Sequence, residues 1–249
     1  MNCSPTPTSW YTLPGSRACA PRGGASFDEY LQLNVHTTQR LLEASRRSAI
    51  SRFVYASSSS VYGQAGSYPT DESMLPRPFS PYGVTKLAGE HLVSLYRENY
   101  ALPTVSFRFF TVYGPRQRPD MAFSRFFASA IAGTPVTVYG DGTQVRDFTF
   151  VGDVVNALLR VSSHEGQLPP VMNLAGGSSV TVLQVLDTIA ELTGRPVDIE
   201  HLPTVNGDVF RTGGVANLAR EALGWAPQTT LESGLRAQYE WILTASSMR

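Results

Sequence analysis

Cysteine is almost absent from this chain of 249 residues, which contains only Cys3 and Cys19. Two cysteines are too few for a disulfide framework, and neither stands at a spacing from a second cysteine or a histidine that builds a zinc site. We therefore expect no metal centre. The same scarcity favours a reducing compartment, so we expect the protein in the cytoplasm.

An excess of charge of one sign and a long apolar run are also absent. The 20 lysines and arginines balance the 20 aspartates and glutamates, and no dense basic cluster offers a surface to nucleic acid or to an anionic membrane. Nowhere do 18 apolar residues follow one another, and residues 1–10 contain no apolar stretch of the kind found in signal peptides. We expect a soluble protein with no nucleic-acid or membrane partner.

Residues 2–24 lack apolar periodicity and contain four prolines and three glycines. Because these residues interrupt regular structure, we predict neither helix nor strand there. Regular structure is expected to begin at Ser26, since Ser26 and Glu29 have the spacing of a capping box. An apolar stripe of helical period follows it, made of Phe27, Tyr30, Leu31, Val35, Thr38, Leu41 and Leu42.

Short apolar runs then alternate with helical patterns. Residues 53–56, 104–110 and 171–174 have the composition of buried strands, and helices are predicted near 81–96, 123–132, 154–161 and 181–192. This alternation is typical of parallel βαβ units. The predicted fold class is therefore α/β, with an open parallel sheet and helices on both of its faces.

Tyr82 and Lys86 are the first candidates for chemistry. They are four residues apart in a helix that Ser80 caps and Pro81 opens, so the phenol and the ammonium lie on one face. A neighbouring cation favours the phenolate and lowers the tyrosine pKa toward the range of a useful base. By itself, however, this spacing is common in helices and more often belongs to a structural pair than to a site.

Two polar features add context to this pair. Residues 57–60 are four consecutive serines at the end of an apolar strand, the edge where open α/β folds bind ligands. The alternative is that they only satisfy the backbone of a turn. Asn34 lies on the apolar stripe of the first helix, where a buried amide needs partners. Either a site role or a bridge to the backbone would provide them.

Five ordered blocks of the sequence resemble the extended short-chain dehydrogenase/reductase family of NAD-dependent epimerases and dehydratases. They are SSSSVYG at 57–63, SPYGVTK at 80–86, RFFTVYGP at 108–115, RPDMA at 118–122 and GDGTQVRDF at 140–148. Within the family the similarity is greatest to UDP-glucose and UDP-glucuronate 4-epimerases, and it covers about residues 26–249. The resemblance implies a nucleotide-sugar epimerase that uses NAD.

The resemblance also implies a role for each candidate. Tyr82 would be the base at the sugar 4-hydroxyl, Lys86 its electrostatic partner and a ligand of the nicotinamide ribose, and Ser58 a proton shuttle. Asn34 would organise a water molecule. A hydride would leave sugar C4 for NAD and return to the opposite face of the 4-keto sugar, without net oxidation.

Further ligand contacts come from the resemblance alone. It implies that NAD contacts Ser57, Tyr82, Lys86 and Phe109, and that a UDP-sugar contacts Ser59, Thr111, Thr137, Tyr139, Arg146 and Asp208. The alternative for Arg146 is a surface ion pair with Asp147. The position of a second phosphate-binding arginine holds Val205, and Arg211 is the candidate to replace it.

The residues after the predicted strand at 53–56 distinguish between reactions of the family. Dehydratases have an acidic pair where this chain has Ser59 and Ser60, and decarboxylases keep a glutamate at the second position. Elimination of water needs an extra acid and base, so their absence favours epimerisation. A nucleotide-sugar reductase or dehydratase of the same family is the alternative.

The glycine-rich turn of the family, Gly-x-x-Gly-x-x-Gly after a buried strand, is missing from these residues. In the family this turn holds the cofactor pyrophosphate. We expect an N-terminally truncated, partial Rossmann-like sheet, in which the strand at 53–56 is exposed along one edge and NAD binds weakly. Activity of the chain is then in question, and an inactive fragment or pairing subunit is the second hypothesis.

The resemblance finally implies a division of the chain. Residues 1–25 would be an irregular segment outside the family, and residues 26–112 and 151–177 the remnant of the NAD-binding domain. Residues 113–150 and 178–249 would form a smaller substrate-binding lobe. A homodimer would form through the helices at 26–44 and 81–96.

Overall fold

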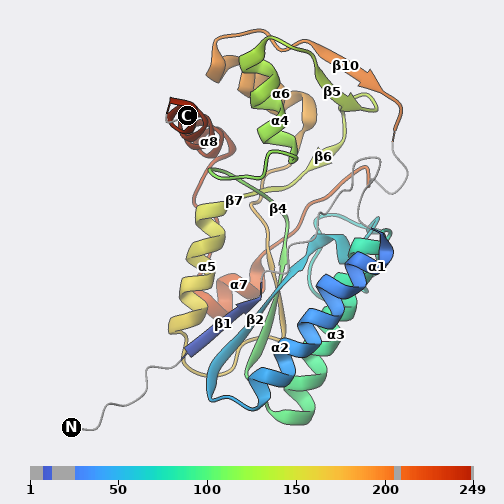
Figure 1. Cartoon of the computed structure of the whole chain (residues 1–249), viewed down its shortest axis with the longest axis vertical. Helices are drawn as coiled ribbons and strands as arrows, with labels where there is room; N and C mark the ends of the chain where they lie inside the picture. Colours follow the sequence, from blue (N-terminus) through green and yellow to red (C-terminus); the bar gives the residue numbers. More distant parts are fainter. Residues whose placement is uncertain (1–7, 13–25, 205–208, 248–249) are drawn as a thin grey trace, which may run out of the picture.

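The computed structural model describes residues 8–12, 26–204 and 209–247. A four-stranded parallel sheet with the order β1-β2-β3-β8 forms its lower half in Figure 1. The strands are β1 (Thr8–Thr12), β2 (Ile50–Ser58), β3 (Thr104–Phe109) and β8 (Val171–Leu174). The predicted α/β class is confirmed. Strands β2 and β8 contain the predicted strands at 53–56 and 171–174, and β3 matches the one at 104–110 except for its last residue.

Strand β1 corrects two predictions. Residues 2–24 were predicted to form no strand, yet β1 lies within them and pairs with β2 from Thr8 opposite Ile50 to Thr12 opposite Tyr55. A parallel ladder satisfies backbone donors and acceptors whatever the local propensity. Strand β2 therefore has a neighbour on each side, and Phe53 and Tyr55 are fully buried. The predicted open edge at 53–56 is wrong. Residues 1–7 and 13–25 lie outside the described part.

Helices cover both faces of the sheet, as predicted (Figure 1). The first helix of the chain and α3 (Pro81–Tyr100) cover one face, where Leu42 and Val93 pack on Phe53 and Tyr55. On the other face lie α5 (Val151–Ser163) and α7 (Asn217–Leu223). Helix α7 was not predicted. No helix in the described ranges has the length and apolarity that a bilayer-spanning helix needs.

The first helix contains a π-helical segment. It runs from α1 (Phe27–Tyr30) through the π-helix η1 (Leu31–His36) to α2 (Thr37–Arg46). The Ser26 side chain accepts a hydrogen bond from the Glu29 amide at 3.2 Å, which confirms the predicted start. The wider π-turn rotates the buried face. The buried residues are Tyr30, Asn34, Thr38, Leu42 and Ser45, whereas Phe27, Leu31 and Leu41 of the predicted stripe are exposed.

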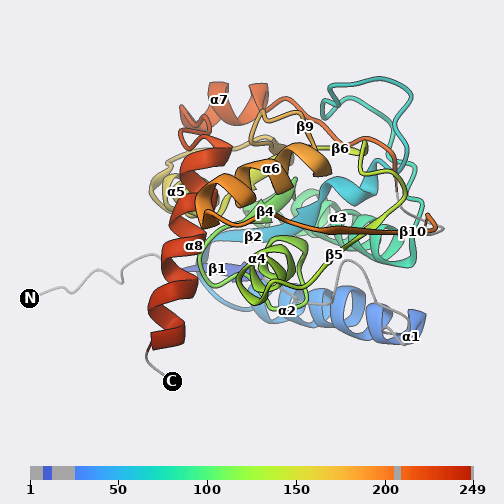
Figure 2. The ribbon, with the colours of Figure 1, turned by 90° about the horizontal axis from the view of Figure 1, so that it is seen from above.

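The second half of the fold lies above the sheet in Figure 1. Its strands β5 (Val136–Tyr139) and β10 (Ile199–Leu202) pair in parallel. Three helices accompany them: α4 (Ala122–Ala132), α6 (Val182–Thr193) and the unpredicted α8 (Leu231–Ser247), which runs along one side of the molecule in Figure 2. Phe123, Phe127, Val185 and Leu235 lie in its core.

Short strand pairs and one tight turn complete the described fold. Strand β4 (Thr111–Tyr113) pairs with β7 (Phe148–Phe150), and β6 (Val145–Arg146) pairs with β9 (Val180–Thr181). The 3-10 helix η2 (Ser59–Val61) follows β2 directly. The chain passes between the two halves several times, so residues of β2, α3 and β6 come from distant parts of the sequence to the same end of the sheet.

Candidate active site

The carboxyl end of β2 meets the first turns of α3. Helix α3 starts where predicted, because the Ser80 side chain accepts a hydrogen bond from the Gly83 amide at 3.1 Å and Pro81 occupies the first turn. Lys86 is 3% exposed, and its Nζ donates to the Ala56 carbonyl in β2 at 3.0 Å. The same Nζ lies 5.7 Å from the centre of the Tyr82 ring. The predicted pair is therefore brought to the end of the strand.

The pKa values of this pair differ from the sequence-based expectation. Burial raises the pKa of Tyr82 to about 12, and a hydrogen bond with the Ser58 side chain lowers it only in part. Burial also lowers the pKa of Lys86 to about 8. The prediction of a lowered Tyr82 pKa is thus wrong for the protein alone, because desolvation of the phenolate outweighs the groups that favour it.

Ser58 lies at the end of β2, where the strand meets η2 and α3. Its Oγ donates to Ser60 Oγ at 3.1 Å and accepts a hydrogen bond from the Ser60 amide at 3.2 Å, so it caps η2. Ser58 thus satisfies a turn, as the structural alternative proposed, and its side chain also lowers the pKa of the Tyr82 phenol. Ser59 is the first residue of η2 and is half-buried. Its contact with a sugar stays a prediction.

Asn34 reaches α3 from the π-helical segment. It is fully buried, and its Nδ2 donates to Thr85 Oγ1 at 3.0 Å. The Thr85 hydroxyl in turn donates to the Tyr82 carbonyl at 3.0 Å, and the Asn34 carbonyl accepts from Thr38 Oγ1 at 2.7 Å. The ring of Tyr30 stands edge-on to Tyr82, with 6.0 Å between centroids. Asn34 therefore fixes the segment that carries Tyr82, and its role toward a water molecule stays a prediction.

The two remaining predicted cofactor contacts lie on opposite faces of the sheet. Ser57 is buried, and its hydroxyl donates to Glu90 Oε1 on α3. Phe109 is half-buried at the end of β3, opposite Ser58, and its ring lies 6.3 Å from that of Phe107. The contacts of Ser57 and Phe109 with NAD stay predictions.

The predicted substrate residues lie in the second half of the fold and in β4. Thr137 and Tyr139 are in β5, Thr111 begins β4, and Arg146 ends β6. One guanidinium nitrogen of Arg146 donates to the carbonyls of Val145 and Phe210, at 3.1 and 3.0 Å. Contact of these residues with a UDP-sugar stays a prediction. Asp208 and Val205 lie outside the described residues.

Asp147 is a group that the sequence reasoning did not assign to a site. It is 2% exposed, so a surface ion pair with Arg146 does not describe it. Its carboxylate accepts hydrogen bonds from the amides of Gly176 at 2.9 Å and Gly214 at 3.3 Å, which ties three segments together. Burial raises the pKa of Asp147 to about 7, against these backbone hydrogen bonds. In the sequence, the position of Asp147 next to Arg146, a candidate for binding phosphate, was the signal that could have drawn attention to it.

Glu90 and Arg108 were also missed. They form an ion pair with side chains 5% exposed, beside Ser57 and one helical turn beyond Lys86. Arg108 occupies the middle of an apolar strand, where an arginine is rarely buried without a partner. This was the signal in the sequence that could have identified the pair.

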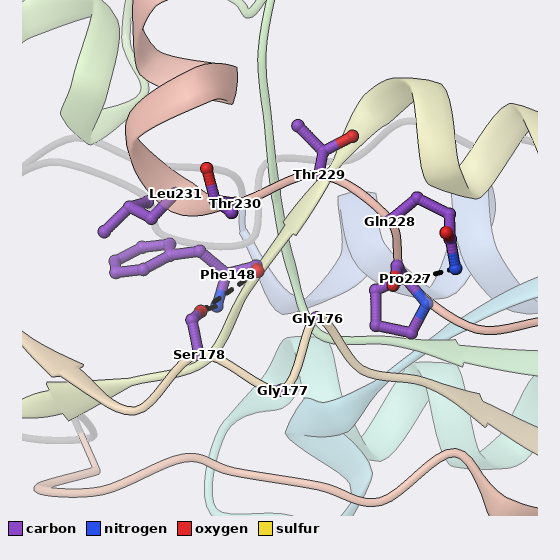
Figure 3. Close-up of a pocket in the computed structure, with 9 residues that line it drawn as sticks. All are labelled: Phe148, Gly176, Gly177, Ser178, Pro227, Gln228, Thr229, Thr230 and Leu231. Carbon is purple, nitrogen blue, oxygen red and sulfur yellow. Dashed lines mark hydrogen bonds between the residues drawn. The ribbon is translucent and has the colours of Figure 1, made fainter.

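A surface hollow of about 290 Å³ lies between β7, the loop after β8 and the segment before α8 (Figure 3). Phe148, Gly176, Gly177, Ser178 and residues 227–231 line it. Ser178 Oγ accepts from the Phe148 amide and donates to the Phe148 carbonyl. None of the predicted site residues lines this hollow. In the described residues no group of three or more histidines, cysteines, aspartates or glutamates could hold a metal ion.

Comparison with known proteins gives consistent matches. The model of the NAD dependent epimerase/dehydratase family matches residues 6–175, a range that includes β1, the serines, Tyr82 and Lys86. The uncharacterized UDP-glucose epimerase YtcB of Bacillus subtilis is 38% identical over 230 residues, which are 92% of this chain and 72% of YtcB. UDP-glucose 4-epimerase of Mycolicibacterium smegmatis is 36% identical over 86% of this chain and 69% of its own length.

Solved structures agree with these relatives. UDP-glucuronic acid 4-epimerase from Bacillus cereus, in complex with UDP-glucuronic acid and NAD, is 38% identical with a TM-score of 0.85, covering 89% of this chain and 71% of its own. MoeE5, in complex with UDP-glucuronic acid and NAD, is 44% identical with a TM-score of 0.87, covering 95% and 79%.

Proposed function

Because this chain belongs to the NAD dependent epimerase/dehydratase family, we propose that it is an NAD-dependent UDP-sugar 4-epimerase. The observation that carries the proposal is the meeting of Ser58, Tyr82 and Lys86 at the carboxyl end of β2. Relatives and neighbours named as epimerases of UDP-glucose and UDP-glucuronic acid support it.

The residues present fit the reactive end of the cofactor. Lys86 is buried beside Tyr82, with its ammonium held by the Ala56 carbonyl, and Tyr82 is half-buried in the first turn of α3. We infer that Tyr82 and Lys86 would hold the nicotinamide ribose, with Ser57 and Phe109 near the ring. When bound, NAD supplies the hydride acceptor and donor for sugar C4, and its oxidised ring adds a positive charge that favours the phenolate.

The role of Tyr82 is to move one proton at the sugar 4-hydroxyl. With a pKa of about 12 in the protein alone, the phenol is protonated at neutral pH. That value already includes the hydrogen bond with Ser58, so Tyr82 becomes a base only in the loaded site, where a further positive charge beside the phenol lowers its pKa. It takes the proton while the sugar is oxidised to the 4-keto form and returns it when the sugar is reduced on the other face. Ser58 relays the proton, and Lys86 stabilises the phenolate.

The pyrophosphate end of NAD has no matching loop in these residues, because the sequence contains no Gly-x-x-Gly-x-x-Gly. We therefore propose that this chain binds NAD weakly. The alternative is an inactive fragment or pairing subunit. Calorimetric titration with NAD, and release of NAD on denaturing the purified protein, distinguish the two. If neither NAD release nor binding heat is found, the enzyme proposal fails for this chain.

The proposal for the nucleotide sugar keeps the predicted division of the chain. We propose that residues 113–150 and 178–249 hold the UDP-sugar, with Arg146 and Arg211 at the diphosphate, and that residues 26–112 and 151–177 serve NAD. Thr111, Thr137, Tyr139 and Asp208 complete this proposed set. Incubation with UDP-glucose and UDP-glucuronic acid, followed by product analysis, tests the reaction. A deoxy or dehydrated product, in place of the 4-epimer, would favour the reductase or dehydratase alternative.

We further propose that two copies associate through the first helix and α3. Both present large apolar side chains to solvent on their outer faces, namely Phe27, Leu33, Leu41, Val84, Leu95 and Tyr100. Burying such a patch between two copies removes it from water. A cytoplasmic location stays a prediction that localisation of a tagged protein would test.

A further inference from the structure

We propose that the buried ion pair between Glu90 and Arg108 holds the serine turn, residues 57–62, in place beside Tyr82. Glu90 and Arg108 are thereby positioning residues, which act through other side chains and do not touch the sugar. The kinetic part of this inference rests on the proposed epimerase function. The structural part is independent of it.

The pair joins α3 to β3 with two hydrogen bonds. Arg108 Nε donates to Glu90 Oε1 at 3.0 Å, and Arg108 Nη2 donates to Glu90 Oε2 at 2.7 Å. A planar guanidinium and a carboxylate in this arrangement fix each other's orientation as well as their distance. Burial by itself would lower the pKa of Arg108, but the hydrogen bonds and charge of Glu90 raise it above its usual value, so the arginine stays charged.

Each member of the pair holds one end of the serine turn. At the first end, Ser57 Oγ donates to Glu90 Oε1. At the other end, Arg108 Nη1 donates to the Tyr62 hydroxyl at 3.0 Å, and that hydroxyl donates to Asn173 Oδ1 in β8 at 2.7 Å. One ion pair therefore fixes both ends of a six-residue segment, and Ser58 lies between the two attachment points.

The serine turn also lies against α3 at a third point. A side-chain carbon built on Gly83 would lie 2.5 Å from the Ser60 carbonyl oxygen, so the backbone of the turn touches the helix next to Tyr82. Glu90 is on the same helix, two turns beyond Tyr82. Helix α3 thus holds both the serine turn and the Tyr82 phenol in place. Such an arrangement suits an interaction between Ser58 and Tyr82 that must be kept through a catalytic cycle.

A purely structural role predicts something different. Replacing a buried ion pair by apolar groups is often neutral for stability, so the pair is weak evidence of a stabilising function. If the ion pair served only stability, its variants would lose turnover in proportion to the folded fraction. Amide hydrogen exchange in the serine turn would then follow global unfolding. If the role of the ion pair is positioning, the turn loosens while the fold persists.

The variants that test the inference are Glu90→Gln, which removes the charge at almost constant shape, and Tyr62→Phe, which removes only the hydroxyl. Tyr62→Phe is the milder of the two and carries the test if Glu90→Gln does not fold. Val161→Ala is the matched control, because Val161 is buried on the opposite face of the sheet and its truncation costs stability without touching the turn.

Amide hydrogen exchange is the readout that needs no activity. In the structure the amides of residues 62 and 63 donate to the carbonyls of Ser59 and Ser60, at 3.0 and 3.3 Å. We expect both test variants to speed exchange at these two amides by at least about tenfold, while core amides of β3 keep their protection. The control is expected to leave residues 62 and 63 unchanged. Unchanged exchange in both test variants overturns the inference, even if the protein proves not to be an epimerase.

The second readout is steady-state kinetics, measured with NAD and a UDP-sugar that the unmodified protein converts. We expect kcat to fall at least about tenfold with little change in KM, because a displaced Ser58 costs more in the transition state than in binding. The acid limb of the kcat profile is expected to move to higher pH, since Ser58 lowers the Tyr82 pKa. A raised KM at constant kcat, with an unshifted profile, contradicts positioning. Absence of turnover in the unmodified protein counts against the proposed function instead.

Discussion

The side chain of Asn34 donates a hydrogen bond to the Thr85 hydroxyl across 3.0 Å, inside the interface between the first helix and α3. Thr85 passes this restraint to the Tyr82 carbonyl, three residues earlier. The candidate base is thus held through its backbone by a residue 48 positions before it in the sequence. The π-turn at Leu31–His36 allows this contact, because it brings Asn34 onto the buried face.

Asn34→Leu is expected to lower the free energy of unfolding by about 1–3 kcal/mol, because the Thr85 hydroxyl loses a buried partner. Chemical denaturation measures the loss. Thr85→Val removes the other partner, and the double variant should lose less than the sum of the two single losses if the bond is the cause. Strict additivity would show that the two side chains act separately.

Tyr82→Phe is expected to reduce turnover of a UDP-sugar by about 10²–10⁴-fold, because the group that moves the proton at the sugar hydroxyl is lost. Product formation is measured with NAD in excess. Tyr100→Phe is the matched control, since Tyr100 is exposed at the far end of the same helix. Undiminished turnover of Tyr82→Phe would remove Tyr82 from the assigned role.

Gly83→Ala reverses a general rule. Alanine in the interior of a helix is normally more stable than glycine by roughly 0.5–1 kcal/mol. At Gly83 the added carbon would lie 2.5 Å from the Ser60 carbonyl oxygen, so the serine turn or the helix must move. We expect a lower melting temperature and lower turnover. Gly213→Ala is the control, because nothing lies within 4 Å of its added carbon. A stabilised Gly83→Ala protein would contradict the close contact.

Asp147 is expected to make the folded protein less stable as the pH rises toward 7. Its pKa is raised from 3.8 to about 7, so the folded protein binds a proton more tightly than the unfolded chain. Its contribution therefore favours folding at low pH, and it is lost as the pH rises from 3.8 to about 7, with little change above. Over that window we expect Asp147→Asn to lose less stability than the unmodified protein does.

Denaturant titrations at a series of pH values measure this difference in slope. Asp141→Asn is the control, because Asp141 has a lowered pKa, and its contribution changes only below its unfolded value of 3.8. It should leave the slope between pH 4 and 7 as it is in the unmodified protein. Identical slopes for Asp147→Asn and the unmodified protein would mean that Asp147 is ionised across this range.

Leu33→Asp and Val84→Asp are expected to weaken self-association at least about tenfold, because each places a charge in the apolar patch proposed to lie between two copies. Sedimentation velocity over a range of protein concentrations measures the effect. Leu159→Asp is the control, since Leu159 is exposed on α5, across the sheet from the patch. Equal association of all three variants would place the interface elsewhere.

Local patterns in the sequence predicted much of the fold. Ser26 and Ser80 each cap a helix where the capping patterns placed them, and Val171–Leu174 matches the predicted strand in full. These features depend on neighbours within a few residues. The burial of Asn34 was also predicted from its place in an apolar stripe, although the π-turn leaves Leu31 of that stripe exposed while Asn34 is buried.

Features that depend on distant residues were missed or wrong. Strand β1 exists because β2, about 40 residues away, offers it a ladder, which the prolines and polar residues around β1 in the sequence do not indicate. The raised pKa of Tyr82 comes from burial under elements that the sequence does not place. The partners Glu90 and Arg108 are 18 residues apart on different elements, so no spacing rule connects them.

Helix α3 has an inner and an outer face with different tasks. Inward it presents Lys86 and Glu90 to the sheet, and outward it presents Val84 and Leu95 to solvent. If a second copy docks on the outer face, as proposed, it contacts the same helix that carries the candidate reacting groups on its inner face. Turnover per molecule would then fall when the protein is diluted below the dissociation constant of the dimer, so that turnover itself would report on the associated fraction.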